Sequence, residues 1–293
     1  METAQKPLIK KGWQRAIIYL VGVVLIVVFI ELFGGFIINL FGVDTGNVDN
    51  SILNFAVVYF LLGALVFAFT LFMRRLIDRR SFASLGFAWK GYRNEAGLGF
   101  FSAFALLGIG TLILVAIGYL SFITITFDAG PFFLQLAAMI VVAFVEELLF
   151  RGYLLNNLMQ SMNKWLALAI SALLFSTFHA ANPDVTVFAI VNIFIAGLLL
   201  GLNYIFTKNL WFGIFFHFAW NYLQGPVLGY DVSGLQLSSL FQQSLLGPEL
   251  WTGGPFGFEG SLLCPLLLAV TLAVFAYAFN KRYQVTSGQG ESF

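Results

Sequence analysis

The stretch AFVEELLFRGYLL, residues 143–155, places two adjacent glutamates and an arginine in a run that is otherwise apolar. A charge inside a membrane costs at least about 2.5–3.5 kcal/mol unless it is paired or hydrated, so these residues are functional candidates. Of the 293 residues in the chain, 60% are hydrophobic and 10% are charged, against about 25% charged in a typical soluble domain. This composition predicts an integral protein of the lipid bilayer. We expect no nucleic-acid partner.

Eight apolar runs are long enough to cross a bilayer, which takes about 17–25 residues in a helix. They cover residues 16–42, 52–77, 97–126, 132–155, 165–181, 185–207, 210–229 and 261–280. The first run is far longer than the roughly 7–15 apolar residues of a signal peptide, so we expect it to stay as a membrane anchor. The sequence therefore predicts an all-α, polytopic membrane protein with about eight transmembrane helices.

The charged residues predict an orientation for these helices. With eight crossings, all fifteen Lys and Arg residues fall on or toward one side, including the basic connection 78–96. The loops on the other side carry acidic residues such as Asp128, Asp184 and Glu259, and no basic residue. By the positive-inside rule, both termini are predicted to be cytoplasmic. The outer segment 230–260 mixes Gly, Pro, Leu and Phe, and we expect it to form a partly buried cap.

Helical spacing separates the roles of the three charges in the opening stretch. Glu147 and Arg151 are four residues apart, so they share one helix face and can neutralise each other. Glu146 is turned by about 100° from Glu147 and has no local partner. The alternative interpretation is that the cluster is only an ion pair that joins helices.

The two histidines of the chain lie in two later apolar runs. Phe175 and His179 are four residues apart in one run, and His217 and Asn221 are four residues apart in another. Each polar residue could simply join packed helices. If they converge with Glu146, however, they form a set of one carboxylate, two imidazoles and an amide that can hydrolyse a bond.

Two hydrolytic chemistries are open to this set. In the first, the poorly hydrated Glu146 carboxylate is a general base, and His217 and Asn221 donate hydrogen bonds to a developing oxyanion. In the second, Glu146, His179 and His217 bind Zn²⁺ with an open position for water. The soluble-metalloprotease motif H-E-x-x-H is absent, and the single cysteine, Cys264, can form neither an intrachain disulfide nor a thiolate cluster.

The motifs resemble those of the CPBP intramembrane proteases, which include type II CAAX prenyl endopeptidases and bacterial relatives linked to bacteriocin immunity. They are E-E-x-x-x-R at Glu146, Glu147 and Arg151, F-x-x-x-H at Phe175 and His179, and H-x-x-x-N at His217 and Asn221. The resemblance implies that Glu146 is the catalytic carboxylate and that His179 assists it on the attacking water. It implies a second imidazole and an oxyanion donor, or groups near a metal, at His217 and Asn221, with Glu147 and Arg151 as supports.

The resemblance also implies a domain layout and a location. We expect N-terminal helices with a basic loop in residues 1–130, a catalytic core in residues 131–229, and the outer segment, last helix and tail in residues 230–293. We expect a multi-pass protein of a bacterial cell membrane that acts on a peptide or membrane-protein substrate, prenylated or not. A proton-coupled transporter or channel, and a catalytically silent immunity or binding protein, are the alternative functions.

Ideal helix geometry predicts a mismatch in height between the two histidines. His179 lies about 22 Å along its helix from Lys164, whereas His217 lies only about 13 Å from Lys208. Either a turn within residues 156–164 or a strong stagger of the helices is needed to bring them level.

Overall fold

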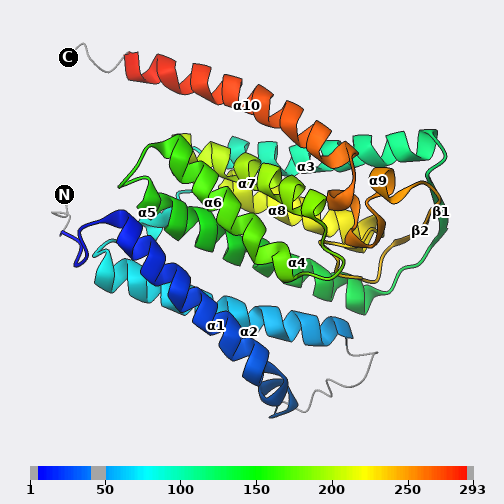
Figure 1. The fold of residues 1–293 in the computed structure, drawn as a ribbon, viewed down its shortest axis with the longest axis horizontal. Coiled ribbons are helices and arrows are strands. Elements are labelled where there is room, and N and C mark those ends of the chain that lie inside the picture. Colours follow the sequence, from blue (N-terminus) through cyan, green and yellow to red (C-terminus); the bar gives the residue numbers. More distant parts are fainter. Residues whose placement is uncertain (1–5, 41–50, 289–293) are drawn as a thin grey trace.

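The structure is a computed structural model that describes residues 6–40 and 51–288, and this part is predominantly helical (Figure 1). Seven of its helices are long and apolar enough to cross a membrane. The predicted all-α polytopic membrane fold is therefore confirmed. Residues 41 and 42, at the end of the first predicted span, lie outside the described residues.

The long helices follow the predicted apolar runs, with short π-helical or 3₁₀ segments attached to some of them. In chain order the elements are α1 Gly12–Leu40, α2 Ser51–Phe72 with η2 Met73–Ile77, η3 Phe82–Leu85, α3 Arg93–Ala116, β1 Leu120–Ile125, α4 Ala129–Glu147 with η4 Leu148–Leu155 and α5 Asn156–Leu158, α6 Lys164–Phe178 with η5 His179–Ala181, α7 Val187–Thr207, α8 Trp211–Tyr222 with η6 Leu223–Val227, β2 Phe241–Leu245, α9 Glu249–Thr252, η7 Gly254–Phe256, η8 Phe258–Gly260 and α10 Leu263–Gly288.

Helix α8 is the central element of the fold. It packs against α3, α4 and α7, while α1 and α2 lie on one side of these helices and α10 lies on the other (Figure 1). A Cβ on Gly99 of α3 would lie 2.3 Å from the carbonyl oxygen of Phe212, so the close contact between α3 and α8 requires glycine. This packing buries a helix that carries two of the predicted site residues.

Two of the predicted spans differ from the structure. In the run 210–229, the α-helix α8 has only 12 residues. It is followed from Leu223 by the π-helical segment η6, which contains Pro226. The run is therefore not among the seven helices that are long enough to span a membrane. The run 97–126 is helical only to Ala116, because Gly118 has a φ of 76° and the following residues form β1. Strand β1 is rich in β-branched residues, which favour strands, and it pairs antiparallel with β2.

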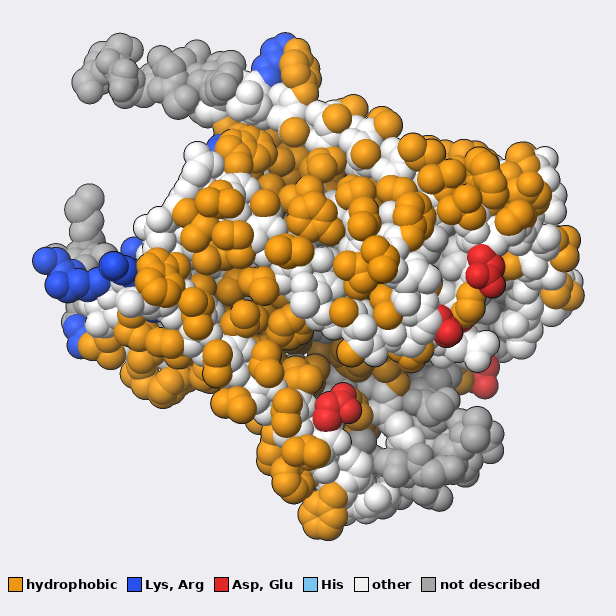
Figure 2. Space-filling view, in the orientation of Figure 1, with side chains coloured by type: hydrophobic (Ala, Val, Ile, Leu, Met, Phe, Trp, Pro, Cys, Tyr) orange, Lys and Arg blue, Asp and Glu red, His pale blue; other side chains and the backbone are white. Residues whose placement is uncertain are grey.

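The segment 230–260 folds back onto the helices. Its side chains Tyr230, Val232, Phe256 and Phe258 are all buried. This confirms the predicted partly buried cap. On the face shown in Figure 2, the Lys and Arg side chains gather near the start of α1 and along the later part of α10, and the carboxylates lie away from them. The side of the membrane that each end faces stays a prediction.

Three of the arginines that we placed on or toward one side of the membrane are buried in the fold: Arg15, Arg74 and Arg151. Arg15 and Arg74 share one carboxylate, because their Nη1 atoms lie 2.9 and 2.8 Å from the two oxygens of Asp78. The hydroxyl of Tyr153 donates to the same carboxylate at 3.2 Å. This network joins α1, η2 and η4 at one end of the bundle.

We predict that Asp78→Asn lowers the free energy of unfolding by about 3–5 kcal/mol, because it leaves two buried guanidinium groups without a countercharge. Thermal or denaturant unfolding in detergent measures the loss. Glu249→Gln is the control, because it removes a carboxylate from an exposed position. Exposed charges contribute about 0–1 kcal/mol, so equal losses in the two variants would contradict a structural role for the network.

Candidate active site

Glu147 lies at the end of α4 and forms the predicted ion pair with Arg151. The Nη1 atom of Arg151 donates to Oε1 of Glu147 at 2.7 Å, and its Nη2 atom donates to the carbonyl oxygen of Gly197 in α7 at 2.9 Å. Both charged side chains are fully buried. The pairing predicted from the four-residue spacing is confirmed, and it persists where the helix widens into the π-helical segment η4.

The same glutamate also holds His217 of α8. The Nδ1 atom of His217 lies 3.2 Å from Oε1 of Glu147. A carboxylate that pairs with arginine can only accept hydrogen bonds, so Nδ1 carries the proton and donates. Gly213 leaves room for this contact, because a Cβ there would lie 2.5 Å from Oε2 of Glu147. Glu147 therefore orients the imidazole and leaves its Nε2 atom available.

Glu146 differs from its neighbour because it has no partner of its own. Its side chain is 21% exposed, and its Oε2 atom accepts no hydrogen bond within the described chain. Nε2 of His217 lies 3.8 Å from that oxygen, which is beyond hydrogen-bond distance. The lack of a local partner agrees with the prediction from helical spacing.

His179, at the end of α6, has one nitrogen fixed and one available. Its Nδ1 atom lies 2.8 Å from the carbonyl oxygen of Phe175 and must donate, since a carbonyl oxygen only accepts. The Phe175 ring lies between the two imidazoles, with centroid distances of 4.7 Å to His179 and 5.9 Å to His217. The guanidinium of Arg151 lies 4.5 Å from the centroid of the same ring. Phe175 thus packs against three of the candidate residues.

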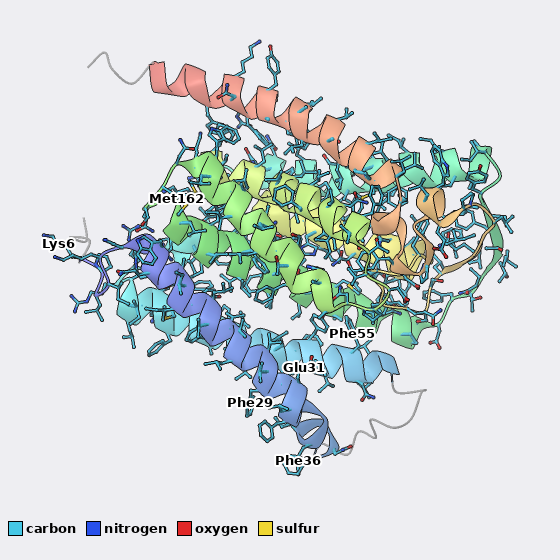
Figure 3. All side chains as sticks on the ribbon, viewed as in Figure 1. Lys6, Phe29, Glu31, Phe36, Phe55 and Met162 are labelled. Atoms are coloured by element: carbon cyan, nitrogen blue, oxygen red, sulfur yellow. The ribbon has the colours of Figure 1, made fainter. Side chains whose placement is uncertain are left out.

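A cavity of about 200 Å³ brings four of the candidates together: Glu146, His179, His217 and Asn221 all line it. The side chain of Asn221 makes no hydrogen bond to another described residue and is therefore available to a ligand. A second cavity, of about 310 Å³, also reaches Glu146 and His179. Figure 3 labels Phe55 of α2, which lines the first cavity, and Glu31 of α1, which lines the second.

Both histidines line one cavity, although ideal helix geometry predicts a mismatch in height between them. Asn209 and Leu210, in the turn before α8, are buried and bonded to the connection that follows η3. The backbone N–H of Leu210 donates to the carbonyl oxygen of Gly86 at 3.0 Å, and Nδ2 of Asn209 donates to the carbonyl oxygen of Ala88 at 2.7 Å. Helix α8 therefore starts inside the fold, so distance from Lys208 does not measure depth.

Three further cavity residues were not found from the sequence: Tyr59 of α2, Glu259 of η8 and Cys264 of α10. Tyr59 lines both cavities, yet a tyrosine in an apolar helix carries no signal of such a position. Glu259 was counted only as an acidic residue of the outer loop. Its place in the cavity depends on how the segment 230–260 folds back.

The zinc hypothesis requires three ligands that converge on one point. Among residues 6–40 and 51–288, no group of three His, Cys, Asp or Glu side chains is arranged so that it could hold a metal ion. Nε2 of His217 lies 3.8 Å from Glu146 and could still ligate a metal, but no third side chain among the described residues converges with this pair. The described side chains do not fit a three-ligand zinc site, and we derive no step through a metal.

The fold and the cavity together describe a polytopic membrane protein with a hydrolase-like site between its helices. Residues 128–223 match the family model described as "Type II CAAX prenyl endopeptidase Rce1-like". This match supports the resemblance of the motifs to the CAAX proteases. The matched segment contains all six predicted site residues: Glu146, Glu147, Arg151, His179, His217 and Asn221. A search of curated proteins and a search of solved structures each found no match. The family supports a membrane-embedded protease in general.

Proposed function

We propose that the protein is an intramembrane endopeptidase that hydrolyses a peptide bond of a membrane-associated substrate, with Glu146 as the general base. One observation carries the proposal: a carboxylate with a free oxygen shares a cavity with two imidazoles and an unbonded amide. The family match supports the same reaction class. Each group has hydrogen-bonding capacity that the fold leaves unused.

The unused groups divide into acceptors and donors. Glu146 and Nε2 of His179 are acceptors, and together they can hold the two hydrogens of one water molecule. Nδ2 of Asn221 is a donor, and so is Nε2 of His217 when the imidazole is protonated. The acceptors orient and deprotonate the water, and the donors stabilise the negative oxygen that forms on the carbonyl, a contribution of about 2.7–4 kcal/mol per donor.

The proton balance follows from this division. Glu146 takes a proton from the water as the new C–O bond forms, and the carbonyl oxygen becomes negative. Glu146 then gives that proton to the leaving nitrogen as the C–N bond breaks, so that a carboxylic acid and an amine result. Glu147 and Arg151 do not touch the reacting atoms in this scheme; they position His217.

A proton-coupled transporter is the competing function, since buried Glu and His side chains also relay protons. Purified protein in proteoliposomes, supplied with a membrane-tethered peptide, distinguishes the two functions. We expect two peptide products by mass spectrometry and no proton flux under a pH gradient. Flux without cleavage would favour the transporter, and neither activity would favour a silent binding or immunity protein. Cytoplasmic termini and a bacterial cell membrane remain part of the proposal.

We predict that chelation leaves proteolysis unchanged, because the described residues do not provide three metal ligands. The purified protein is treated with a strong chelator, its zinc content is measured by elemental analysis, and its turnover is compared before and after. Added Zn²⁺ should produce no increase. Stoichiometric zinc that is lost together with activity, and restored with it, would show that Glu146, His179 and His217 bind metal after all.

A further inference from the structure

The cavity that contains Glu146 has a second polar region that the proposed mechanism does not use. Glu259 of η8, Ser233 of the segment 230–260 and Asn192 of α7 all line the cavity. Glu259 and Ser233 lie outside the segment that matches the family model, residues 128–223. Asn192 lies inside that segment, so the region is built jointly by α7 and the segment 230–260.

Glu259 is held in place but is not neutralised. Its Oε1 atom accepts from Nε1 of Trp220 at 3.1 Å, and its Oε2 atom accepts from the hydroxyl of Ser233. Both donors are uncharged, and no lysine or arginine is found among the described residues that line the cavity. An ionised carboxylate offers about four acceptor positions, so these two bonds leave about two positions for a ligand.

Asn192 supplies a second, independent acceptor in the same wall. Its Nδ2 atom donates to the carbonyl oxygens of Glu259 and Ser261, at 2.8 and 3.1 Å. These bonds fix the amide, but its Oδ1 atom has no hydrogen-bond partner among the residues that the structure describes, although Asn192 is 1% exposed. A buried acceptor without a donor is unusual in a folded protein and calls for an explanation such as a ligand.

The turn that carries Ser233 is anchored on both sides. Nδ2 of Asn182 donates to the carbonyl oxygen of Ser233 at 3.0 Å, and the backbone N–H of Gly234 donates to the carbonyl oxygen of Phe256 at 3.1 Å. Ser233 has a φ of 48°, a conformation that serine adopts only where its surroundings impose it. The hydroxyl is thereby directed onto Glu259, which fixes the carboxylate in the cavity wall.

We propose that Glu259 and Oδ1 of Asn192 form a subsite for a positively charged group of the substrate, an ammonium or a guanidinium. Such a group is all donor and would satisfy both free acceptors. The rest of the cavity wall is mainly apolar and suits the alkyl part of a lysine or arginine side chain. This inference rests on the proposed function. It implies that the enzyme selects peptides with a basic residue near the cleaved bond and disfavours an acidic group there.

Binding of a small probe tests the subsite without any cleavage. Hexylammonium and 1-hexanol share one alkyl chain, and titration calorimetry in detergent compares their affinities for the wild-type protein. We expect the ammonium to bind about 10- to 100-fold more tightly, as charge-assisted hydrogen bonds allow. Glu259→Gln should remove this difference. Glu249→Gln is the matched control, because it removes the same charge from an exposed position in the same segment.

Cleavage of matched peptides then tests the consequence for specificity. Peptides that differ only in Lys, Gln or Glu at each position beside the cleaved bond are compared by kcat/KM. We expect a preference for Lys at one position, which Glu259→Gln abolishes while the peptide with Gln is still cleaved.

The outcomes separate this inference from the proposed function. Cleavage without any preference for Lys, or equal binding of hexylammonium and hexanol by the wild-type protein, would overturn the subsite even if Glu259→Gln failed to fold. Preferential binding of hexylammonium that Glu259→Gln removes, with no cleavage of any peptide, would instead support the subsite and contradict the endopeptidase.

Discussion

Glu146→Gln is expected to lower peptide turnover by about 10²- to 10⁴-fold, the usual contribution of a general base. Glutamine keeps the shape of the side chain and removes the group that accepts the proton of water. Since Oε2 of Glu146 has no hydrogen-bond partner in the described chain, the melting temperature should stay close to that of the wild type. Turnover is measured with a membrane-tethered peptide, and folding is measured by thermal unfolding in the same detergent.

Two variants serve as controls for this result. Glu31→Gln removes a carboxylate of α1 that lines only the second cavity, and this variant should cleave at nearly the wild-type rate. Glu147→Gln should lose stability, because it deprives the buried Arg151 of its charge partner. Normal stability with no activity in Glu147→Gln, together with full activity in Glu146→Gln, would assign the base to Glu147 instead.

The two histidines should behave as one unit when they are removed. We expect His179→Ala and His217→Ala each to lose most of the turnover. The kcat of the double variant should be within about tenfold of the kcat of the less active single variant, since the effects of groups that act together are not additive. Steady-state kcat for the four proteins gives the comparison, and thermal unfolding checks that each variant is folded. Losses that multiply would place the two imidazoles in independent roles, and wild-type rates in both single variants would make them packing residues.

Much of the helical fold could be predicted because apolar run length is a local property of the sequence. The errors occurred where length alone is ambiguous. Residues 120–125 are apolar enough to extend a helix, but their strand forms only because β2, more than a hundred residues later, pairs with it. The run 210–229 has the right length, yet Pro226 and burial among neighbouring helices produce a shorter element.

The candidate site was predictable to the extent that its contacts lie within one helix. The Glu147–Arg151 pair follows from a spacing of four residues, and the scarcity of histidine pointed to His179 and His217. The contact between His217 and Glu147 could not be predicted, because it joins residues 70 positions apart and depends on space beside Gly213. Arg15 and Arg74 were counted only among the basic residues on or toward one side of the membrane, since the sequence does not show that both would be buried around one carboxylate, Asp78.

The only cysteine of the chain, Cys264, is a site at which a label could be attached inside the cavity that contains Glu146. Its side chain is 1% exposed and lines the same cavity as Glu146 and the two histidines. Because this thiol is buried in a cavity of about 200 Å³, only a small tag attached to it would fit inside the cavity, and there is no second cysteine to remove beforehand. The native sequence can therefore be labelled at a single site. The size of a small thiol adduct at Cys264 would determine how much of the cavity volume remains for a substrate.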